Sequence, residues 1–320
     1  MESIASAPGK IILFGEHAVV YNQPAIAAAV DKRAVVSVKK SENNYTTLKS
    51  YDLGFEAILN TKEKSYELVS GKPGIIRYIL EAFFNAHDHS PVDILLSLAF
   101  PVGSGLGSSA AVTVATLAAL YGYHNKKFTK KTLAHNAYIV EKKVQGMASP
   151  LDTLISTNAG LIYLNRDKKV SRFKVDLKPT FVIGYTSKKR STQKMVKKVS
   201  ELRKRNPIVV DSIIQTMGLL TEEAKNAILK MDNDKIAQLL NINQGLLDSI
   251  GVNTVELSRM VFRARKYGAS GAKITGAGGG GSMIAFCPNR SGEVYHSLKN
   301  RDNGLKVNIS NEGIILKTRV

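Results

Sequence analysis

Short apolar runs along the chain alternate with longer segments of helical spacing, so both strands and helices are predicted. The short runs are rich in β-branched residues, which is typical of strands. They lie at Val35–Val38, Val92–Phe100, Leu161–Leu164, Phe181–Tyr185, Ser282–Cys287 and Leu305–Ile309. Strands are therefore expected in the early, central and closing parts of the chain.

Longer segments predict the helices. Ser108–Leu120 is Ala-rich and begins with two serines, which suits a buried helix with a serine N-cap. Thr132–Val144 predicts a second helix that ends before the next glycine. Residues 192–267 predict a run of helices, of which one starts at Thr221 and another has a capped start within Asn253–Glu256.

The order of these elements predicts two structural units. Strands and helices alternate early, helices dominate the middle and strands close the chain, which indicates an α/β or α+β fold. A chain of 320 residues is also longer than one compact core usually serves. Because Asn165–Lys169 is polar and charged, we expect an N-terminal domain at residues 1–170 and a C-terminal domain at residues 171–320.

Hydropathy and cysteine content suggest where the protein acts. The longest apolar stretches, Ala25–Val30, Ile94–Phe100 and Ala110–Leu120, are too short to span a bilayer. The first residues lack the basic and apolar regions of a secretory signal. The single cysteine, Cys287, lies in an apolar strand pattern and is expected to be buried, and it can form no internal disulfide. We therefore expect a cytoplasmic protein without a membrane partner.

The net charge of +19, from 45 basic and 26 acidic residues, has three interpretations. It fits a nucleic-acid surface, attraction of anionic small molecules such as ATP, or the bulk composition of the source organism. The chain has no aromatic ribonucleoprotein motif, zinc-ligand spacing or basic zipper, so we expect no nucleic-acid partner. The densest basic block, Lys188–Arg205, predicts an amphipathic helix with a solvated basic face.

A glycine-rich segment between a predicted strand and helix is the strongest candidate for chemistry. It reads Pro101-Val102-Gly103-Ser104-Gly105-Leu106-Gly107-Ser108-Ser109-Ala110-Ala111. Its glycines allow positive φ angles and close approach of the backbone to a ligand. The following helix adds free N–H groups and the positive end of its dipole, which suits phosphate. Taken alone, the pattern is equally typical of a tight turn.

Two further segments contain glycines beside apolar strands. Lys10, Glu16 and His17 flank an apolar strand in Ala7–Tyr21, and each of them alone is typical of a solvated turn. Lys273–Ser282 carries a run of glycines directly before an apolar strand. Such a run is common in flexible linkers, but here close approach of the backbone to a ligand or another loop is the better interpretation.

Two carboxylates, Glu141 and Asp152, follow the predicted buried helix. Phosphoryl transfer needs a carboxylate for Mg²⁺ and usually another near the attacking hydroxyl. Spacing alone does not assign these roles, because Glu141 is equally typical of a helix surface and Asp152 of an N-cap.

Together the three glycine-containing segments resemble the GHMP kinase superfamily. Pro-Gly-Lys at residues 8–10 with Gly-Glu-His at 15–17 is similar to motif 1 of that superfamily. Residues 101–111 are similar to motif 2, and Lys-Ile-Thr-Gly-Ala-Gly-Gly-Gly-Gly at 273–281 to motif 3. The resemblance spans nearly the whole chain. It implies a two-domain fold: an N-terminal α/β domain, a C-terminal domain with a ferredoxin-like sheet, and an active site between them.

Within the superfamily, the chain is most similar to mevalonate kinases of the shorter archaeal type. Gly15–Tyr21 has the pattern of that group, whereas galactokinases continue with Thr-Asp-Tyr, and Glu141–Thr153 resembles the same group. The resemblance implies a homodimer that transfers the γ-phosphoryl group of ATP, with Mg²⁺, to the C5 hydroxyl of mevalonate. A mevalonate 3-kinase or a phosphomevalonate kinase is the alternative. A catalytically dead sensor is disfavoured by Lys10, Glu141 and Asp152.

The same resemblance implies roles for single residues. Asp152 matches the catalytic carboxylate that faces the substrate hydroxyl, and Lys10 matches the lysine that contacts both. Glu141 and Ser108 match ligands of Mg²⁺ and phosphate, and the choice between Ser108 and Ser109 as the metal ligand stays open.

Binding residues follow in the same way. The implied phosphate-binding residues are Pro101, Gly103, Ser104, Gly105, Leu106, Gly107, Ser108 and Ser109. The implied substrate-binding residues are Lys10, Glu16, His17, Asp152, Gly276, Ala277 and Gly278. One departure is the stretch Thr186–Thr192, which is more basic than is usual in mevalonate kinases.

Overall fold

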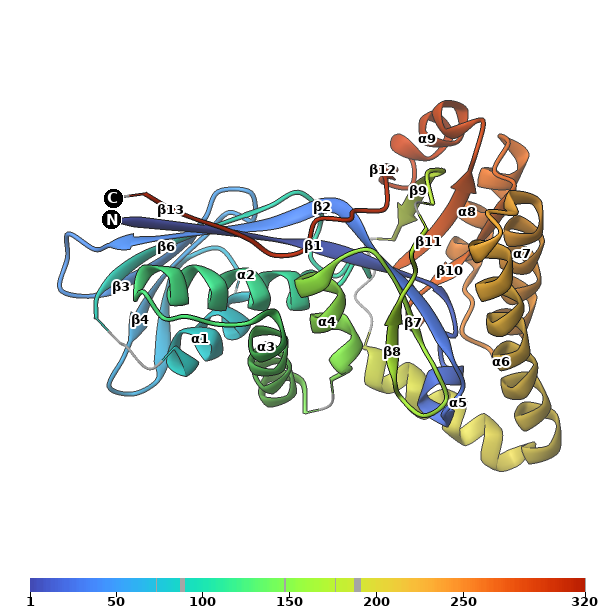
Figure 1. Ribbon diagram of the computed structural model, residues 1–320, viewed down its shortest axis with the longest axis horizontal. Helices are drawn as coiled ribbons and strands as arrows, with labels where there is room; N and C mark the ends of the chain where they lie inside the picture. The colour runs from blue at the N-terminus through green and yellow to red at the C-terminus, as the bar shows by residue number, and fades with distance from the viewer. Residues whose placement is uncertain (73, 87–89, 147, 176, 187–190, 320) are drawn as a thin grey trace.

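Two sheets, each covered by its own helices, organise the chain (Figure 1). The computed structural model describes residues 1–72, 74–86, 90–146, 148–175, 177–186 and 191–319. Within these residues the larger sheet has nine strands and the smaller sheet has four.

The larger sheet takes its strands from the first half of the chain and from the C-terminus. They are β1 (Glu2–Phe14), β2 (Ala25–Lys40), β3 (Thr46–Ser50), β4 (Phe55–Asn60), β5 (Ser65–Ser70), β6 (Val92–Leu98), β7 (Leu161–Leu164), β8 (Val170–Arg172) and β13 (Ile315–Arg319). The main strand order is β13-β1-β2-β6-β3-β4-β5, with β7 pairing to β2 and to β8. The long strands β1 and β2 therefore lie side by side between β13 and β6.

One face of this sheet is covered by helices (Figure 1). They are α1 (Ile76–Asn85), α2 (Ser108–Tyr123), α3 (Lys130–Gln145) and α4 (Pro150–Asn158). Helix α2 packs against β1 and β2 on one side and against α1 and α3 on the other. Its side chains are buried almost all the way round, as expected for a helix that is apolar on every face.

The smaller sheet has the order β10-β11-β9-β12 and is antiparallel throughout. Its strands are β9 (Thr180–Tyr185), β10 (Gly271–Thr275), β11 (Ser282–Cys287) and β12 (Leu305–Val307). Helices α5 (Thr192–Arg205), α6 (Pro207–Leu229), α7 (Asn233–Ser249) and α8 (Val255–Lys266) lie between β9 and β10, and α9 (Ser291–Lys299) lies between β11 and β12. This βαββαβ arrangement confirms the predicted ferredoxin-like sheet.

The end of the chain returns to the first sheet. Strand β13 pairs antiparallel with β1, from Glu2 opposite Arg319 to Ser6 opposite Ile315, so the two termini lie side by side (Figure 1). The division at residue 170 stays a prediction, and β13 shows that the larger sheet uses residues from both sides of it.

Most elements expected from the pattern are confirmed, and two details are wrong. No helix starts at Thr221, which lies inside α6 and donates its hydroxyl to the carbonyl of Met217 at 2.7 Å. Helix α6 begins instead at Pro207, since proline suits the first helical position. Helix α2 has no serine cap: Gly107 is the N-cap, in the left-handed region, and Ser108 is the first helical residue. Among the described residues, no helix combines the length and hydropathy needed to cross a membrane.

Candidate active site

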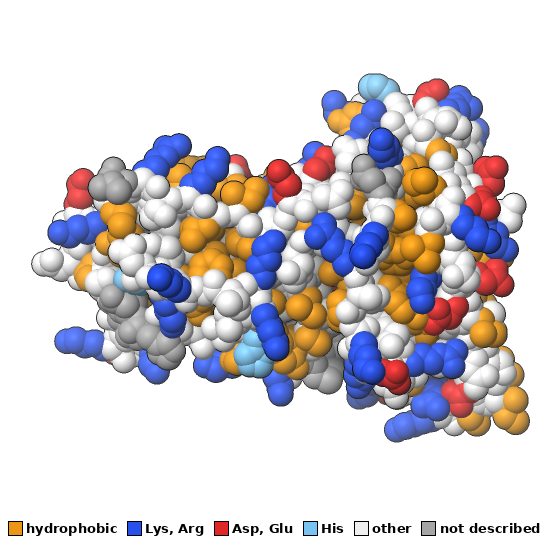
Figure 2. Space-filling model, viewed as in Figure 1, with side chains coloured by type: hydrophobic (Ala, Val, Ile, Leu, Met, Phe, Trp, Pro, Cys, Tyr) orange, Lys and Arg blue, Asp and Glu red, His pale blue; other side chains and the backbone are white. Residues whose placement is uncertain are grey.

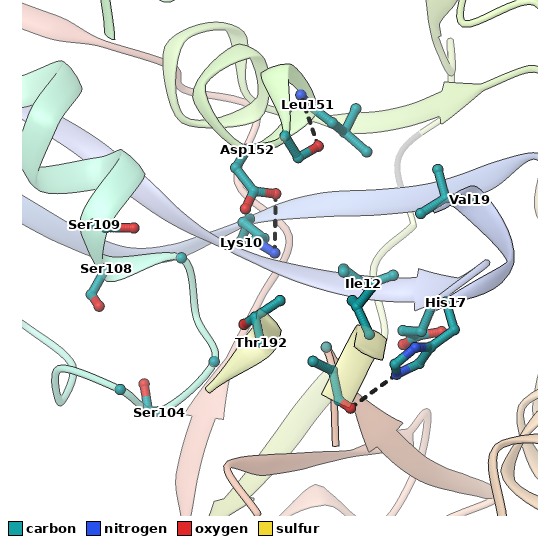
Figure 3. A pocket seen from close by; sticks show the side chains of 18 of the residues that line it. Lys10, Ile12, His17, Val19, Ser104, Ser108, Ser109, Leu151, Asp152 and Thr192 are labelled. Atoms are coloured by element: carbon teal, nitrogen blue, oxygen red, sulfur yellow. Dashed lines mark hydrogen bonds and ion pairs between the residues drawn. The ribbon is translucent and has the colours of Figure 1, made fainter. Parts of the chain in front are cut away.

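A cavity of about 560 Å³ is lined by residues of both units (Figure 3). Strand β1, the glycine loop after β6 and the start of α4 contribute from the first unit. The end of β9, the start of α5 and the glycine turn after β10 contribute from the second. The three motifs, far apart in the sequence, therefore meet around one space.

The glycine loop forms the wall of the cavity at the N-terminus of α2. Gly103, Gly105 and Gly107 have φ angles of 82°, 79° and 69°, a region that disfavours residues with a Cβ. At Gly107 a Cβ would also lie 2.7 Å from Cγ of Lys10. The loop thus leaves the first N–H groups of α2 directed at the cavity end, an arrangement that favours anions.

The predicted phosphate-binding residues divide into two groups. Gly103, Ser104, Gly105, Gly107, Ser108 and Ser109 line the cavity. Pro101 and Leu106 do not line it, but they support the loop: the carbonyl of Pro101 accepts from Oγ of Ser104 at 2.7 Å, and that of Leu106 accepts from the Lys10 amide at 2.8 Å.

Lys10 and Asp152 meet at the cavity wall (Figure 3). Nζ of Lys10 lies 3.1 Å from Oδ1 of Asp152, and the two side chains are 7% and 30% exposed. Lys10 lies beside a register shift in the pairing of β1 with β2. Asp152 lies in the first turn of α4, which Ser149 caps by accepting from the Leu151 amide at 3.3 Å. The pair therefore presents a fixed cation and a partly accessible carboxylate to a ligand.

Glu141 on α3 is a buried carboxylate behind the glycine loop. It is 3% exposed, and its Oε2 accepts from Oγ of Ser109 at 3.3 Å and from Nε2 of Gln145 at 3.2 Å. Burial, followed by the negative charge of Asp152, raises the pKa of Glu141 to about 7. Its other oxygen, Oε1, is buried and has no hydrogen-bond partner within the described residues.

This arrangement fits a Mg²⁺ site. Mg²⁺ takes oxygen ligands, and it commonly binds through one or two carboxylates together with substrate phosphates. The unpartnered Oε1 of Glu141, next to a serine hydroxyl and the phosphate loop, has the chemistry of such a ligand. Over the described part of the chain, no group of three or more His, Cys, Asp or Glu side chains could hold a metal ion alone.

Glu16 and His17 lie in a tight turn after β1 and are both buried. Nε2 of His17 lies 2.9 Å from the carbonyl oxygen of Ala277, which with Gly276 lines the cavity (Figure 3). The carboxylate of Glu16 forms an ion pair with Lys273, and both side chains are fully buried. Glu16 thus reaches the cavity wall while its charge is directed into the protein.

Gly278 differs from its neighbours. It does not line the cavity, and a Cβ there would lie 2.3 Å from the carbonyl oxygen of Val252. Its φ of 69° and its lack of a Cβ let the glycine turn pack closely against the segment between α7 and α8.

The cavity is also lined by Tyr185, Thr186, Thr192 and Val196. The sequence singled out only the stretch Thr186–Thr192, as a departure from the family pattern, and gave no sign of Tyr185 or Val196. Helix α5 was expected as an amphipathic helix, which is confirmed, but its apolar side gave no sign of a site. The basic residues 187–190 lie outside the described residues. Elsewhere Lys and Arg side chains are spread over both units on the face in Figure 2, with no single basic groove on it.

Two family models match the chain. The model of the GHMP kinases N terminal domain matches residues 74–160, and that of the GHMP kinases C terminal domain matches residues 224–303. A mevalonate kinase of Methanothermobacter thermautotrophicus is 44% identical over 315 residues, covering 98% of this chain and 100% of the relative. The chain belongs to the GHMP kinases. A mevalonate kinase of Thermococcus sibiricus is 39% identical, with 93% of each chain covered.

Solved structures agree with this family. A mevalonate kinase of Methanococcus jannaschii superposes with a TM-score of 0.83 at 28% identity, covering 96% of this GHMP kinase and 98% of that chain. A mevalonate kinase of L. major in complex with R-mevalonate has a TM-score of 0.83 at 22% identity, covering 96% of each chain, which shows the shared fold alone. The predicted two-domain GHMP kinase fold is confirmed.

Proposed function

We propose that this GHMP kinase transfers the γ-phosphoryl group of ATP to the C5 hydroxyl of (R)-mevalonate and so forms 5-phosphomevalonate. The full-length similarity to archaeal mevalonate kinases supports the choice of acceptor. The observation that carries the mechanism is the Lys10–Asp152 pair, 3.1 Å apart, in one cavity with the phosphate-type glycine loop.

The nucleotide phosphates bind at the glycine loop in this proposal. The positive φ angles of Gly103, Gly105 and Gly107 expose backbone N–H groups, and the N-terminus of α2 adds its dipole. Glu141, with Ser108 or Ser109, would hold Mg²⁺. The metal ion would supply positive charge that offsets the charge of the nucleotide phosphates.

Asp152 and Lys10 act on the acceptor hydroxyl. Asp152 orients the hydroxyl toward the γ-phosphorus and accepts its proton, while the ammonium of Lys10 stabilises the negative charge that develops on the attacking oxygen. Because the transition state of phosphoryl transfer is loose, the proton leaves late and Asp152 need not be a strong base. Most of the rate enhancement then comes from positioning and electrostatics.

The remaining cavity wall suits a small branched acid. Apolar contacts come from Ile12, Val19, Leu151 and Val196, and polar contacts come from the glycine turn with His17.

We also propose that the protein is a homodimer. Sedimentation equilibrium measures this oligomeric state directly.

The proposal is tested by ATP-dependent phosphorylation of mevalonate, phosphomevalonate, homoserine and galactose side by side. The position of the new phosphate is read by ³¹P and ¹³C NMR. We expect 5-phosphomevalonate as the dominant product. Phosphorylation at C3, or preferred turnover of phosphomevalonate, would instead select one of the alternative kinases and overturn the proposed acceptor.

A further inference from the structure

A fully buried lysine lies behind the part of the cavity that His17, Gly276 and Ala277 line, which is called the acceptor end below. Lys273 on β10 has a side chain with no exposed area, and its ammonium pairs with the equally buried carboxylate of Glu16. The second oxygen of Glu16 lies 3.4 Å from Nδ2 of Asn243 on α7. Burial lowers the pKa of Lys273, and the charge of Glu16 opposes that effect. Such buried pairs are costly to desolvate, so stability alone is a weak explanation for this one.

The pair connects the two units at one turn. Glu16 belongs to the turn after β1, whereas Lys273 and Asn243 belong to the second unit and lie on β10 and α7. Strand β10 is itself fixed, because Oε1 of Gln244 accepts from the Ile274 amide at 2.8 Å and the hydroxyl of Thr275 bonds to the backbone of Ile12. Lys273 is therefore a rigid anchor for Glu16.

The residue next to Glu16 is held in an unusual conformation. His17 has φ 59° and ψ −46°, although it is not glycine. Such a backbone persists only where its surroundings impose it. On one side Glu16 is anchored by Lys273, and on the other Nε2 of His17 lies 2.9 Å from the Ala277 carbonyl. The turn also requires Gly15, where a Cβ would lie 2.4 Å from the carbonyl oxygen of Pro24.

We infer that Lys273 is a positioning residue for the acceptor substrate: through Glu16 it holds the Glu16–His17 turn in the conformation that shapes the acceptor end of the cavity. Both carboxylate oxygens of Glu16 face Lys273 and Asn243, so Glu16 transmits this constraint and does not bind the substrate through its charge. The nucleotide end of the cavity is built on the glycine loop and does not contain this pair. The inference rests on the proposed function for the identity of the acceptor.

The variant Lys273→Met tests the positioning role of Lys273, since methionine has a similar shape without the charge. We expect KM for mevalonate to rise about tenfold or more, the effect of losing one well-placed interaction, while KM for ATP changes much less. Calorimetric binding of ATP, measured without turnover, should be retained. Lys266→Met on α8, an exposed lysine, is the matched control. An equal rise in both KM values, or an unchanged KM for mevalonate, would overturn the inference.

A second variant separates the positioning effect from a loss of stability, because Lys273→Met leaves a buried carboxylate without its ion-pair partner and can destabilise the fold. The double variant Glu16→Gln with Lys273→Met removes both charges. It should fold, as seen in its melting temperature, and keep the raised KM for mevalonate with a normal KM for ATP; a wild-type KM for mevalonate would contradict the inference. If the wild type fails to phosphorylate mevalonate, the proposed function fails instead, and the same KM comparison is made with the alcohol that it does phosphorylate.

Discussion

Lys10 and Asp152 form an ion pair whose members differ in exposure, 7% against 30%. The carboxylate is the more accessible partner, so it is the group that a hydroxyl entering the cavity can meet. The lysine is held from behind by the glycine loop, whose Leu106 carbonyl accepts its amide at 2.8 Å. This difference supports separate roles for the two side chains.

The variant Asp152→Asn should lower kcat by about 10²- to 10⁴-fold, the usual contribution of a positioned general base. ATP binding should be nearly unchanged, because the glycine loop does not depend on Asp152. Steady-state kinetics and nucleotide titration measure the two effects. Asp167→Asn, at the exposed turn between β7 and β8, serves as the control. Near-normal turnover of Asp152→Asn would show that another group meets the hydroxyl.

Glu141 should make the metal-free protein sensitive to pH. Its carboxyl has a pKa of about 7 in the folded protein, against the ordinary 4.5 expected when the chain is unfolded. Between these values the folded state keeps a proton that the unfolded state has lost. This contribution to stability is therefore fully present below pH 4.5 and is lost as the pH rises through about 7.

Melting temperatures of the metal-free wild type and of Glu141→Gln, recorded from pH 5 to pH 8, test this prediction. The wild type should lose stability relative to the variant as the pH rises, because only the wild type must bury a new charge. Added Mg²⁺ and nucleotide should restore the wild type above pH 7 and have a smaller effect on the variant. Parallel profiles for the two proteins would contradict the assigned pKa.

At the scale of elements, the hairpin of β10 and β11 supports both ends of the cavity. At one end Lys273 holds the Glu16 turn, and at the other the hydroxyl of Ser282 donates to the carbonyl of Ser104 in the glycine loop. Both contacts join segments that are far apart in the sequence. The hairpin thus connects the acceptor and nucleotide halves of the site.

Ser282→Ala should raise KM for ATP by about 5- to 10-fold, because an unmet buried carbonyl costs about 1–3 kcal/mol and the loop will shift to relieve it. KM for mevalonate should change less, which is the opposite of the result expected for Lys273→Met. Ser212→Ala is the control, since the hydroxyl of Ser212 donates within α6, to the carbonyl of Ile208 at 2.8 Å. If KM for ATP is unchanged, the glycine loop holds its shape without the hydrogen bond from Ser282 to the Ser104 carbonyl.

At the scale of the whole molecule, the last strand completes the first sheet. Strand β13 covers the edge of β1, and Leu316 packs against Gly122 of α2, where a Cβ would lie 2.8 Å from its Cδ1. Arg33 holds the segment that leads into β13, because its guanidinium donates to the carbonyl of Gly313 at 2.6 Å. The first unit is therefore incomplete without residues from the end of the chain.

A chain that ends at Gly313 should be less stable and more prone to aggregate. It loses the β13 pairing and leaves the edge of β1 unpaired, which is a template for association. We expect the melting temperature to fall by at least about 5 °C, equivalent to roughly 3 kcal/mol in a protein of this size. Thermal unfolding and light scattering measure the change. Lys317→Ala, an exposed side chain on β13, should leave both readings near those of the wild type.

Much of the fold was predictable from local pattern, and the exceptions have physical reasons. Helix α2 and strand β11 are predominantly apolar on every side, so their burial was evident. Strand β3, Thr46–Ser50, has Leu48 as its only large apolar residue, and its pairing with β4 and β6 makes it a strand. The N-cap of α2 was misplaced because Gly107 takes a left-handed conformation that the serines beside it obscured.

By itself, the sequence determined the three motifs and therefore the family, because glycine conformations and helix N-termini depend on a few neighbouring residues. It also indicated the carboxylates Glu141 and Asp152 through resemblance. Only the tertiary structure decided that Glu16 faces Lys273, 257 positions away, and that α5 lines the cavity. Those contacts depend on how the two units pack, and no local pattern of apolar and polar residues records the position of a partner so distant in the chain.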